Sequence, residues 1–126
     1  MRITSALLAI LLVGGCESVP PEPFVQSEFG PERSFTGLLR LGFERQSFDE
    51  CWLDFRGSAM TDLGRLAPSP ALADQTAPYG AEVTLTGRRR AMVNVPGDDL
   101  MGRGFGHLGQ YPCLIEATRI TAARMR

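Results

Sequence analysis

The chain has 126 residues, 13 of them basic and 14 acidic, and its net charge at pH 7 is −1. A chain of this length forms one small domain with a modest core. Because nucleic-acid binders normally present a basic face, this charge balance excludes nucleic acid as an expected partner.

Residues 1–15 have the composition of an export signal. Arg2 precedes an apolar run over residues 6–13, which is shorter than the about 20 apolar residues that a membrane-spanning helix needs. Two glycines then precede Cys16. This order is typical of a signal peptide. An ordinary secretory signal with an incidental cysteine, or a buried amino-terminal helix, is the alternative.

The sequence Val-Gly-Gly-Cys at 13–16 resembles the lipobox of bacterial lipoproteins. In that family the cysteine thiol receives a diacylglyceryl group, and a peptidase then cuts before the cysteine. The resemblance implies that residues 1–15 are removed and that Cys16 is lipidated. Since two or three acyl chains bind a bilayer firmly, it also implies a membrane-anchored protein of the cell envelope. We expect it on the outer membrane, facing the periplasm, with the inner membrane as the alternative.

Residues 16–33 are expected to form a tether. This segment is rich in proline and glutamate, which favours an extended chain without a packed core. At roughly 3 Å per residue it could hold the domain up to about 50 Å from the lipid. Phe24, Val25 and Phe29 are candidates for docking on the domain.

Alternating apolar and polar residues predict strands over 34–44, 51–55 and 81–95. Residues 46–47 are assigned to a turn, and residues 59–66 to a short helix. In the second strand the pattern predicts alternate residues inside and outside the domain.

Pro-Gly-Asp-Asp at 96–99 predicts a turn, and residues 102–109 form a glycine-rich loop. A last strand begins near Tyr111 and contains Cys113, Ile115 and Ala117. The domain is thus expected to span residues 34–121, followed by a polar tail at 122–126.

Four or five strands with one short helix predict a mainly β fold, a small antiparallel barrel similar to the OB-fold. A small β-sandwich or half-barrel is the alternative.

Cys51 and Cys113 remain once Cys16 is assigned to lipid. Export to an oxidising compartment predicts a disulfide between them. In the chain-entropy model, closing a loop of roughly 60 residues contributes about 4 kcal/mol to stability.

The octapeptide Gly-Phe-Gly-His-Leu-Gly-Gln-Tyr at 104–111 resembles a Gly-x-Tyr/Phe-Gly-His-Leu-Gly-x-Tyr signature of small bacterial lipoproteins and secreted proteins. In that group an earlier Gly-Phe-Glu-x-x-x-Phe segment precedes the signature, and residues 42–48 match it. The resemblance covers roughly residues 35–120, but it implies no particular activity.

Gly104, Gly106 and Gly109 also match the dinucleotide-binding pattern Gly-x-Gly-x-x-Gly. That pattern requires a helix directly after the glycines, whereas here Pro112 and a predicted strand follow. The glycines are therefore expected to serve a loop that needs positive φ angles.

His107 is the only histidine. In a glycine loop it is expected to hydrogen-bond backbone and hold the loop. The alternative is a metal site with Cys51, Cys113 or a methionine, but a disulfide would remove the thiolates. A catalytic triad needs a base beside a nucleophile, and Ser58 and Ser69 show no nucleophile-elbow pattern. We therefore predict no catalytic residue, no metal and no cofactor.

Trp52, His107 and Tyr111 are the candidate ligand-binding residues, because exposed aromatic side chains serve as recognition surfaces in ligand-binding barrels. Core packing of the two aromatic residues is the alternative. We predict a non-catalytic envelope lipoprotein with a binding or structural role, whose partner is an envelope protein or glycan. Two alternatives are a small-ligand or metal-binding lipoprotein centred on His107, and an inhibitor of a wall-degrading hydrolase. The latter follows from lysozyme-inhibitor lipoproteins, which are also small disulfide-linked β-barrels.

Overall fold

The computed structural model describes residues 25–74, 76–93 and 102–126. The predicted signal peptide, Cys16 and the predicted turn at 96–99 lie outside these residues. In the described part of the chain, no helix has the length and hydropathy that crossing a bilayer requires.

The described residues form six strands, one α-helix and two single-turn 3-10 helices. In chain order they are β1 (Val25–Gln26), β2 (Arg33–Gly42), β3 (Arg45–Phe48), β4 (Cys51–Phe55), α2 (Ala59–Leu66), η1 (Pro70–Leu72), β5 (Tyr79–Val93), η2 (His107–Gly109) and β6 (Cys113–Met125).

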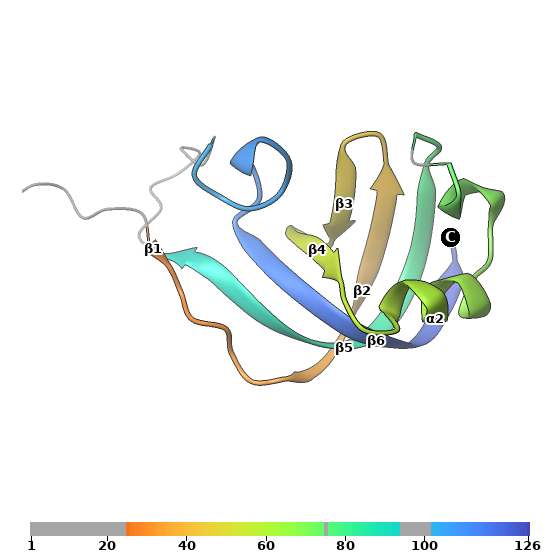
Figure 1. Ribbon diagram of the computed structural model, residues 1–126, viewed down its shortest axis with the longest axis horizontal. Coiled ribbons are helices and arrows are strands. Elements are labelled where there is room, and N and C mark those ends of the chain that lie inside the picture. Colours follow the sequence, from red (N-terminus) through yellow and green to blue (C-terminus); the bar gives the residue numbers. More distant parts are fainter. Residues whose placement is uncertain (1–24, 75, 94–101) are drawn as a thin grey trace, which may run out of the picture.

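Five of these strands close into a barrel (Figure 1). β2 pairs with β3 and β3 with β4, both antiparallel, and β4 pairs with β6 in parallel. β6 then pairs antiparallel with β5, which pairs antiparallel with β2 and closes the ring. With the helix between β4 and β5, this is the strand arrangement of an OB-fold barrel. The predicted OB-like barrel is confirmed, with one parallel pairing among otherwise antiparallel ones.

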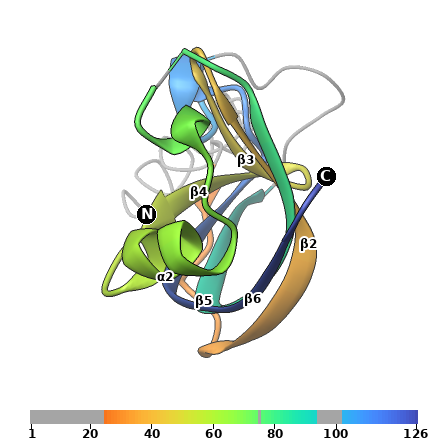
Figure 2. The same cartoon turned by 90° about the vertical axis from the view of Figure 1, so that its right-hand side faces the viewer.

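The long strands β5 and β6 bend around the core, and their pairing is the longest in the barrel (Figures 1 and 2). Ala81, Val83 and Leu85 are buried at alternate positions of β5, as period-two alternation dictates. The pairing shifts register at two points, after Thr84 and after Thr86. Such irregularities bend a strand, which lets the sheet close.

The helix α2 closes one end of the barrel, at the lower right of Figure 1. Leu63 and Ala59 are fully buried in the core. Asp62 accepts hydrogen bonds from the Ile120 backbone N–H (3.0 Å) and the Ser58 hydroxyl (2.9 Å). The helix is thereby joined to β6 by a polar contact as well as by packing. Its bounds agree with the predicted helix at 59–66.

The turn predicted at residues 46–47 is wrong, because both residues lie in β3. The turn lies instead at residues 43–44, where Glu44 has a φ of 58°. Ser47, a polar residue, is buried, and its Oγ accepts a hydrogen bond from Arg45 Nε (3.3 Å). Because this buried position holds a serine, β3 lacks the alternation of apolar and polar residues that predicts a strand.

Part of the predicted tether lies against the barrel. β1 pairs with the end of β5, and the backbone N–H groups of Ser27 and Gly30 donate to β5 carbonyls at 2.8 and 2.9 Å. The ring of Phe29 lies under Arg88, whose guanidinium carbon is 4.2 Å from the ring centroid. Residues 25–30 are therefore docked, as expected for Val25 and Phe29.

The polar tail expected at 122–126 is instead mostly strand. β6 continues to Met125, which pairs with Ala81. Residues 122–125 complete the ladder between β5 and β6 and belong to the barrel, because the long partner strand offers them free hydrogen-bonding groups.

The disulfide between Cys51 and Cys113 is present. It joins the first residues of β4 and β6, the two parallel neighbours, and both cysteines are buried. The link fixes the start of β6 directly after the glycine-rich loop.

Candidate binding site

Trp52 lies on the outer face of β4, between the buried residues Cys51 and Leu53. Tyr111 packs against it edge to face, with ring centroids 5.2 Å apart and an interplanar angle of 60°. Both residues are half-buried. Edge-to-face pairs are favourable because the positive ring edge meets the negative ring face. The pair leaves part of each ring open to a ligand.

The segment 102–112, called the glycine loop below, lies directly on the indole of Trp52. A Cβ atom at Gly106 would come within 2.3 Å of the Trp52 ring, and Gly106 has a φ of 69°. Only glycine satisfies both the close approach and the positive φ at this position. The loop is held by its own backbone: Gly104 N–H donates to Gly109 O (2.8 Å), and Phe105 N–H to Tyr111 O (2.9 Å).

His107 joins the glycine loop to the turn between β2 and β3. Its Nε2 lies 3.1 Å from Oε2 of Glu44. The side chain of His107 is 33% exposed and that of Glu44 is 50% exposed, so both remain accessible to a ligand. The expected loop-holding contact of His107 is thus made to a carboxylate rather than to backbone. The turn at 43–44 and the glycine loop together are called the loop edge.

Two apolar side chains project from the loop edge. Phe43, next to Glu44, is 70% exposed, and Leu108, next to His107, is 59% exposed. Leu108 also has a φ of 56°, a conformation that costs an L-residue about 1–2 kcal/mol. Exposed apolar residues and strained backbone both cluster at binding surfaces.

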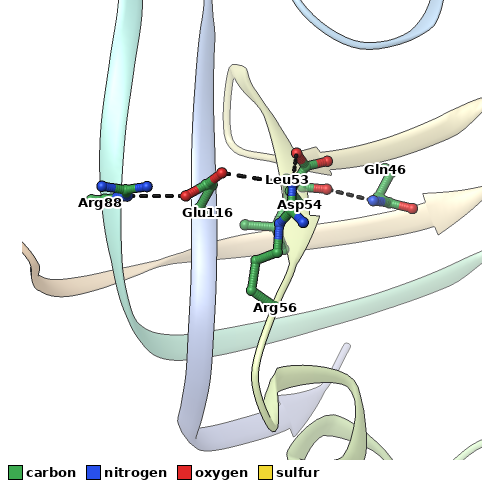
Figure 3. Close-up of polar contacts among 6 residues, drawn as sticks. All are labelled: Gln46, Leu53, Asp54, Arg56, Arg88 and Glu116. Carbon is green, nitrogen blue, oxygen red and sulfur yellow. Dashed lines mark hydrogen bonds and ion pairs between the residues drawn. The ribbon is translucent and has the colours of Figure 1, made fainter. Parts of the chain in front are cut away.

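A cavity of about 490 Å³ lies beside this edge. Its lining includes side chains from β3, β4, α2 and η1, together with the turn at 43–44. Among its lining residues are Phe43, Glu44, Gln46, Trp52, Met60 and Leu72. Gln46 donates a hydrogen bond from Nε2 to the carbonyl of Leu53 (Figure 3). Its amide is therefore held at the point where β3 and β4 diverge.

A chain of ion pairs crosses the outer face of the barrel beside β4 (Figure 3). Glu116 lies between Arg88, at 3.0 Å, and Arg56, at 3.7 Å, and Arg56 also lies 3.7 Å from Asp54. The two arginines are half or more exposed. The cluster thus neutralises its own charge on this face rather than offering a free acid or base.

The remaining polar candidates have structural contacts. In the described part of the chain, the one group with metal-ligand spacing comprises Glu50, Cys51 and Cys113, but the two sulfurs are joined in the disulfide. Ser58 donates its hydroxyl to Asp62, and Ser69 Oγ accepts from a backbone N–H at the start of η1. These contacts provide neither thiolate ligands nor an activated nucleophile.

The structure thus brings the three predicted ligand-binding residues, Trp52, His107 and Tyr111, together at one edge. Sequence reasoning missed Phe43 and Glu44 as members of the site. The signal was present in the resemblance, because residues 42–48 and 104–111 form its two matched segments. These segments meet through the contact between Glu44 and His107.

Comparisons of the chain with protein-family models, with curated proteins and with solved structures found no match. The function is therefore argued from the chemistry of the site, since a fold alone does not determine it.

Proposed function

We propose that this protein is a lipid-anchored envelope protein whose barrel binds a glycan at the loop edge. The observation that carries the proposal is the convergence of Trp52, Tyr111 and Phe43 with the polar pair Glu44 and His107. A sugar has apolar C–H faces, which pack on aromatic rings, and hydroxyl groups, which hydrogen-bond to carboxylate, imidazole and amide groups. The cavity offers both kinds of contact through Phe43, Trp52 and Glu44, and Tyr111 and His107 adjoin it through their contacts with Trp52 and Glu44.

The choice of a glycan follows from the fold and the charge together. OB-fold barrels bind oligonucleotides or oligosaccharides on the sheet face between the loops that correspond to the loop edge. The chain is slightly acidic, and an oligonucleotide would need neutralised phosphates along its backbone. An oligosaccharide imposes no such demand, so it is the occupant that the site supports best.

The anchor is proposed from the lipobox-like sequence at 13–16. Because Val25 is paired with Val93, the chain from Cys16 to Val25 spans at most about 30 Å. This shorter reach replaces the roughly 50 Å expected from a tether of 18 residues, and it keeps the barrel close to the membrane surface. The barrel could therefore contact a glycan that lies close to the bilayer.

Lipidation is tested by labelling cells with an alkyne analogue of palmitate. The full chain should take up the label and sediment with membranes, whereas Cys16→Ser should be unlabelled. Cys51→Ser serves as the matched control and should stay labelled. Equal labelling of Cys16→Ser and the unaltered chain would refute the anchor without bearing on the glycan site.

Glycan binding is tested with the single tryptophan as the reporter. The full-length protein in detergent is titrated with chitobiose and with soluble peptidoglycan fragments while Trp52 fluorescence is followed. We expect a saturable change, and an affinity loss of about tenfold or more in Phe43→Ala, equivalent to about 1.4 kcal/mol. Met125→Ala removes another exposed apolar side chain, 43% exposed, from β6 and should bind normally. Unchanged fluorescence at millimolar sugar would refute the proposal.

A further inference from the structure

A second cavity, also of about 490 Å³, adjoins the first and shares lining residues of the β2–β3 turn with it. Arg40, Arg45 and Arg126 line it, together with Phe43 and two glycines, Gly42 and Gly80. The strand register places Arg40 opposite Gly80 and Gly42 opposite Arg45. Each glycine thus leaves space beside an arginine on the outer face of the barrel.

The two glycines have no steric requirement that explains them. Neither has a positive φ. A Cβ atom at Gly42 would find its nearest neighbour at 3.8 Å, and one at Gly80 at 3.9 Å, both ordinary contact distances. Gly42 is the last residue of β2 and Gly80 is the second residue of β5. Packing therefore requires neither glycine, and together they leave the hollow open.

The side-chain charges around this hollow are unbalanced. No aspartate or glutamate of the described residues lines it. Arg126 pairs with Glu82 at 3.7 Å, whereas Arg40 and Arg45 form no ion pair in the described part of the chain. Among the described residues, the side chain of Arg45 donates a single hydrogen bond, from Nε to Ser47 Oγ. The planar guanidinium group matches the geometry of carboxylate and phosphate.

We infer that this hollow is an anion subsite that takes the carboxylate or phosphate group of a sugar. The inference rests on the proposed glycan function, because Phe43 lines both cavities and a ligand across the β2–β3 turn would contact both. The sugar rings pack at the loop edge, and the anionic substituent lies between Arg40 and Arg45. The site therefore prefers acidic glycans over neutral ones.

The test compares four probes on the full-length protein in detergent: chitobiose, the N-acetylglucosamine–N-acetylmuramic acid disaccharide, chitobiose phosphate and inorganic phosphate. We expect at least one charged sugar to bind about tenfold more tightly than chitobiose, about 1.4 kcal/mol. Arg40→Gln and Arg45→Gln should each abolish most of this preference. Arg40→Gln should also leave chitobiose affinity unchanged, because Arg40 lines only this hollow, whereas Arg45 lines both cavities. Arg119→Gln removes an exposed arginine of β6 outside the cavity and should preserve the preference for charged sugars. The tighter of the two charged sugars identifies the carboxylate or the phosphate as the natural group.

The outcomes separate the two proposals. Equal affinity for charged and neutral sugars, or a preference that survives both arginine variants, overturns the anion subsite and leaves the glycan site standing. Arginine-dependent binding of inorganic phosphate without binding of any sugar supports the subsite as an anion site and refutes the glycan function. Failure of all four probes overturns both. Gly80→Ala provides an independent check, because its added carbon should keep the fold and weaken only the charged sugars.

Discussion

The α2 end and the loop edge of the barrel place the same residue types in opposite environments. At the α2 end Leu63 is fully buried and Asp62 is bonded to β6. At the loop edge Leu108 is exposed and has a positive φ. Glu44 is half-exposed and pairs with His107 of the glycine loop. At the α2 end the apolar groups are buried and the charged group is hydrogen-bonded within the protein. At the loop edge both kinds of group are exposed to solvent.

This difference indicates that the α2 end carries stability, and it supports the proposal that the loop edge binds the ligand. Burying a leucine side chain contributes about 1.5–3 kcal/mol, and that gain is made at the α2 end. At the loop edge the exposed Leu108 and its backbone conformation both oppose stability. Features that cost stability and persist are expected where a ligand is bound.

The largest effect on stability is expected from loss of the disulfide, which joins the first residues of β4 and β6 next to the glycine loop. Replacing both Cys51 and Cys113 by serine opens a loop with a sequence separation of 62 residues. The free energy of unfolding should fall by about 4 kcal/mol in the chain-entropy model, as measured by urea denaturation of the oxidised proteins. Reducing the unaltered chain should reproduce the loss. A loss below about 1 kcal/mol would mean that packing alone holds β4 against β6.

Matched leucine substitutions test the comparison directly. Leu63→Ala leaves a cavity in the core and should lower the free energy of unfolding by about 3 kcal/mol. Leu108→Ala should change it by no more than about 0.5 kcal/mol, and Leu108→Gly should raise it by about 1 kcal/mol because glycine accepts the positive φ. Urea denaturation measures stability, and sugar titration measures binding. If Leu108→Ala destabilised as strongly as Leu63→Ala, the two ends would not differ as described.

A pair of glycine substitutions tests the contact between the glycine loop and Trp52. Gly106 and Gly102 have similar φ angles, 69° and 77°, but only at Gly106 would a Cβ meet the indole, since nothing lies within 4 Å at Gly102. Alanine should cost about 1–2 kcal/mol in backbone strain at Gly102, and about 1–3 kcal/mol at Gly106, whose ψ of −153° lies in a region that almost only glycine adopts. Only Gly106→Ala should also displace the loop and shift the emission of Trp52. An equal shift in Gly102→Ala would show that the emission reports general strain.

Much of the fold was accessible from the sequence because its barrel strands alternate cleanly. The alternation at residues 81–86 predicted β5, and the helix at 59–66 was found with its observed bounds. β3 was missed, because Ser47 is polar yet buried and the exposed Phe43 lies in the turn. The extent of β6 was missed because residues 122–125 are held by pairing with β5 rather than by burial of apolar side chains.

The site was only partly accessible. Trp52, His107 and Tyr111 are rare residue types, and their chemistry marked them as candidates. Glu44 lies in the matched segment at residues 42–48, but the resemblance gives it no role, and its contact is with a residue 63 positions away. The sequence likewise gives no indication that Arg40 and Gly80, on different strands, are paired neighbours. Contacts of this kind are set by strand register.

The smallest expected effect is the pH dependence of stability that two aspartates cause. Asp62 lies in α2, and Asp74 lines the cavity beside the loop edge. The Ile120 backbone N–H, and next the Ser58 hydroxyl, lower the pKa of Asp62 below its ordinary value of 3.8. The hydroxyl and backbone N–H of Thr76 likewise lower the pKa of Asp74. Stability from a lowered carboxyl pKa is present above the unfolded pKa and is lost as pH falls through the folded pKa.

The partner of Asp62 is 58 residues away, whereas that of Asp74 is two residues away. A contact between distant residues is lost completely on unfolding, but a local turn can persist in the unfolded chain and leave the two pKa values more alike. Urea denaturation between pH 6 and about pH 2.5 should therefore show a fall in stability below about pH 4 that Asp62→Asn largely removes and Asp74→Asn largely retains. If Asp74→Asn removed the fall instead, the polar contact that stabilises the fold would lie beside the binding cavity, and the assignment of stability to the α2 end would be wrong.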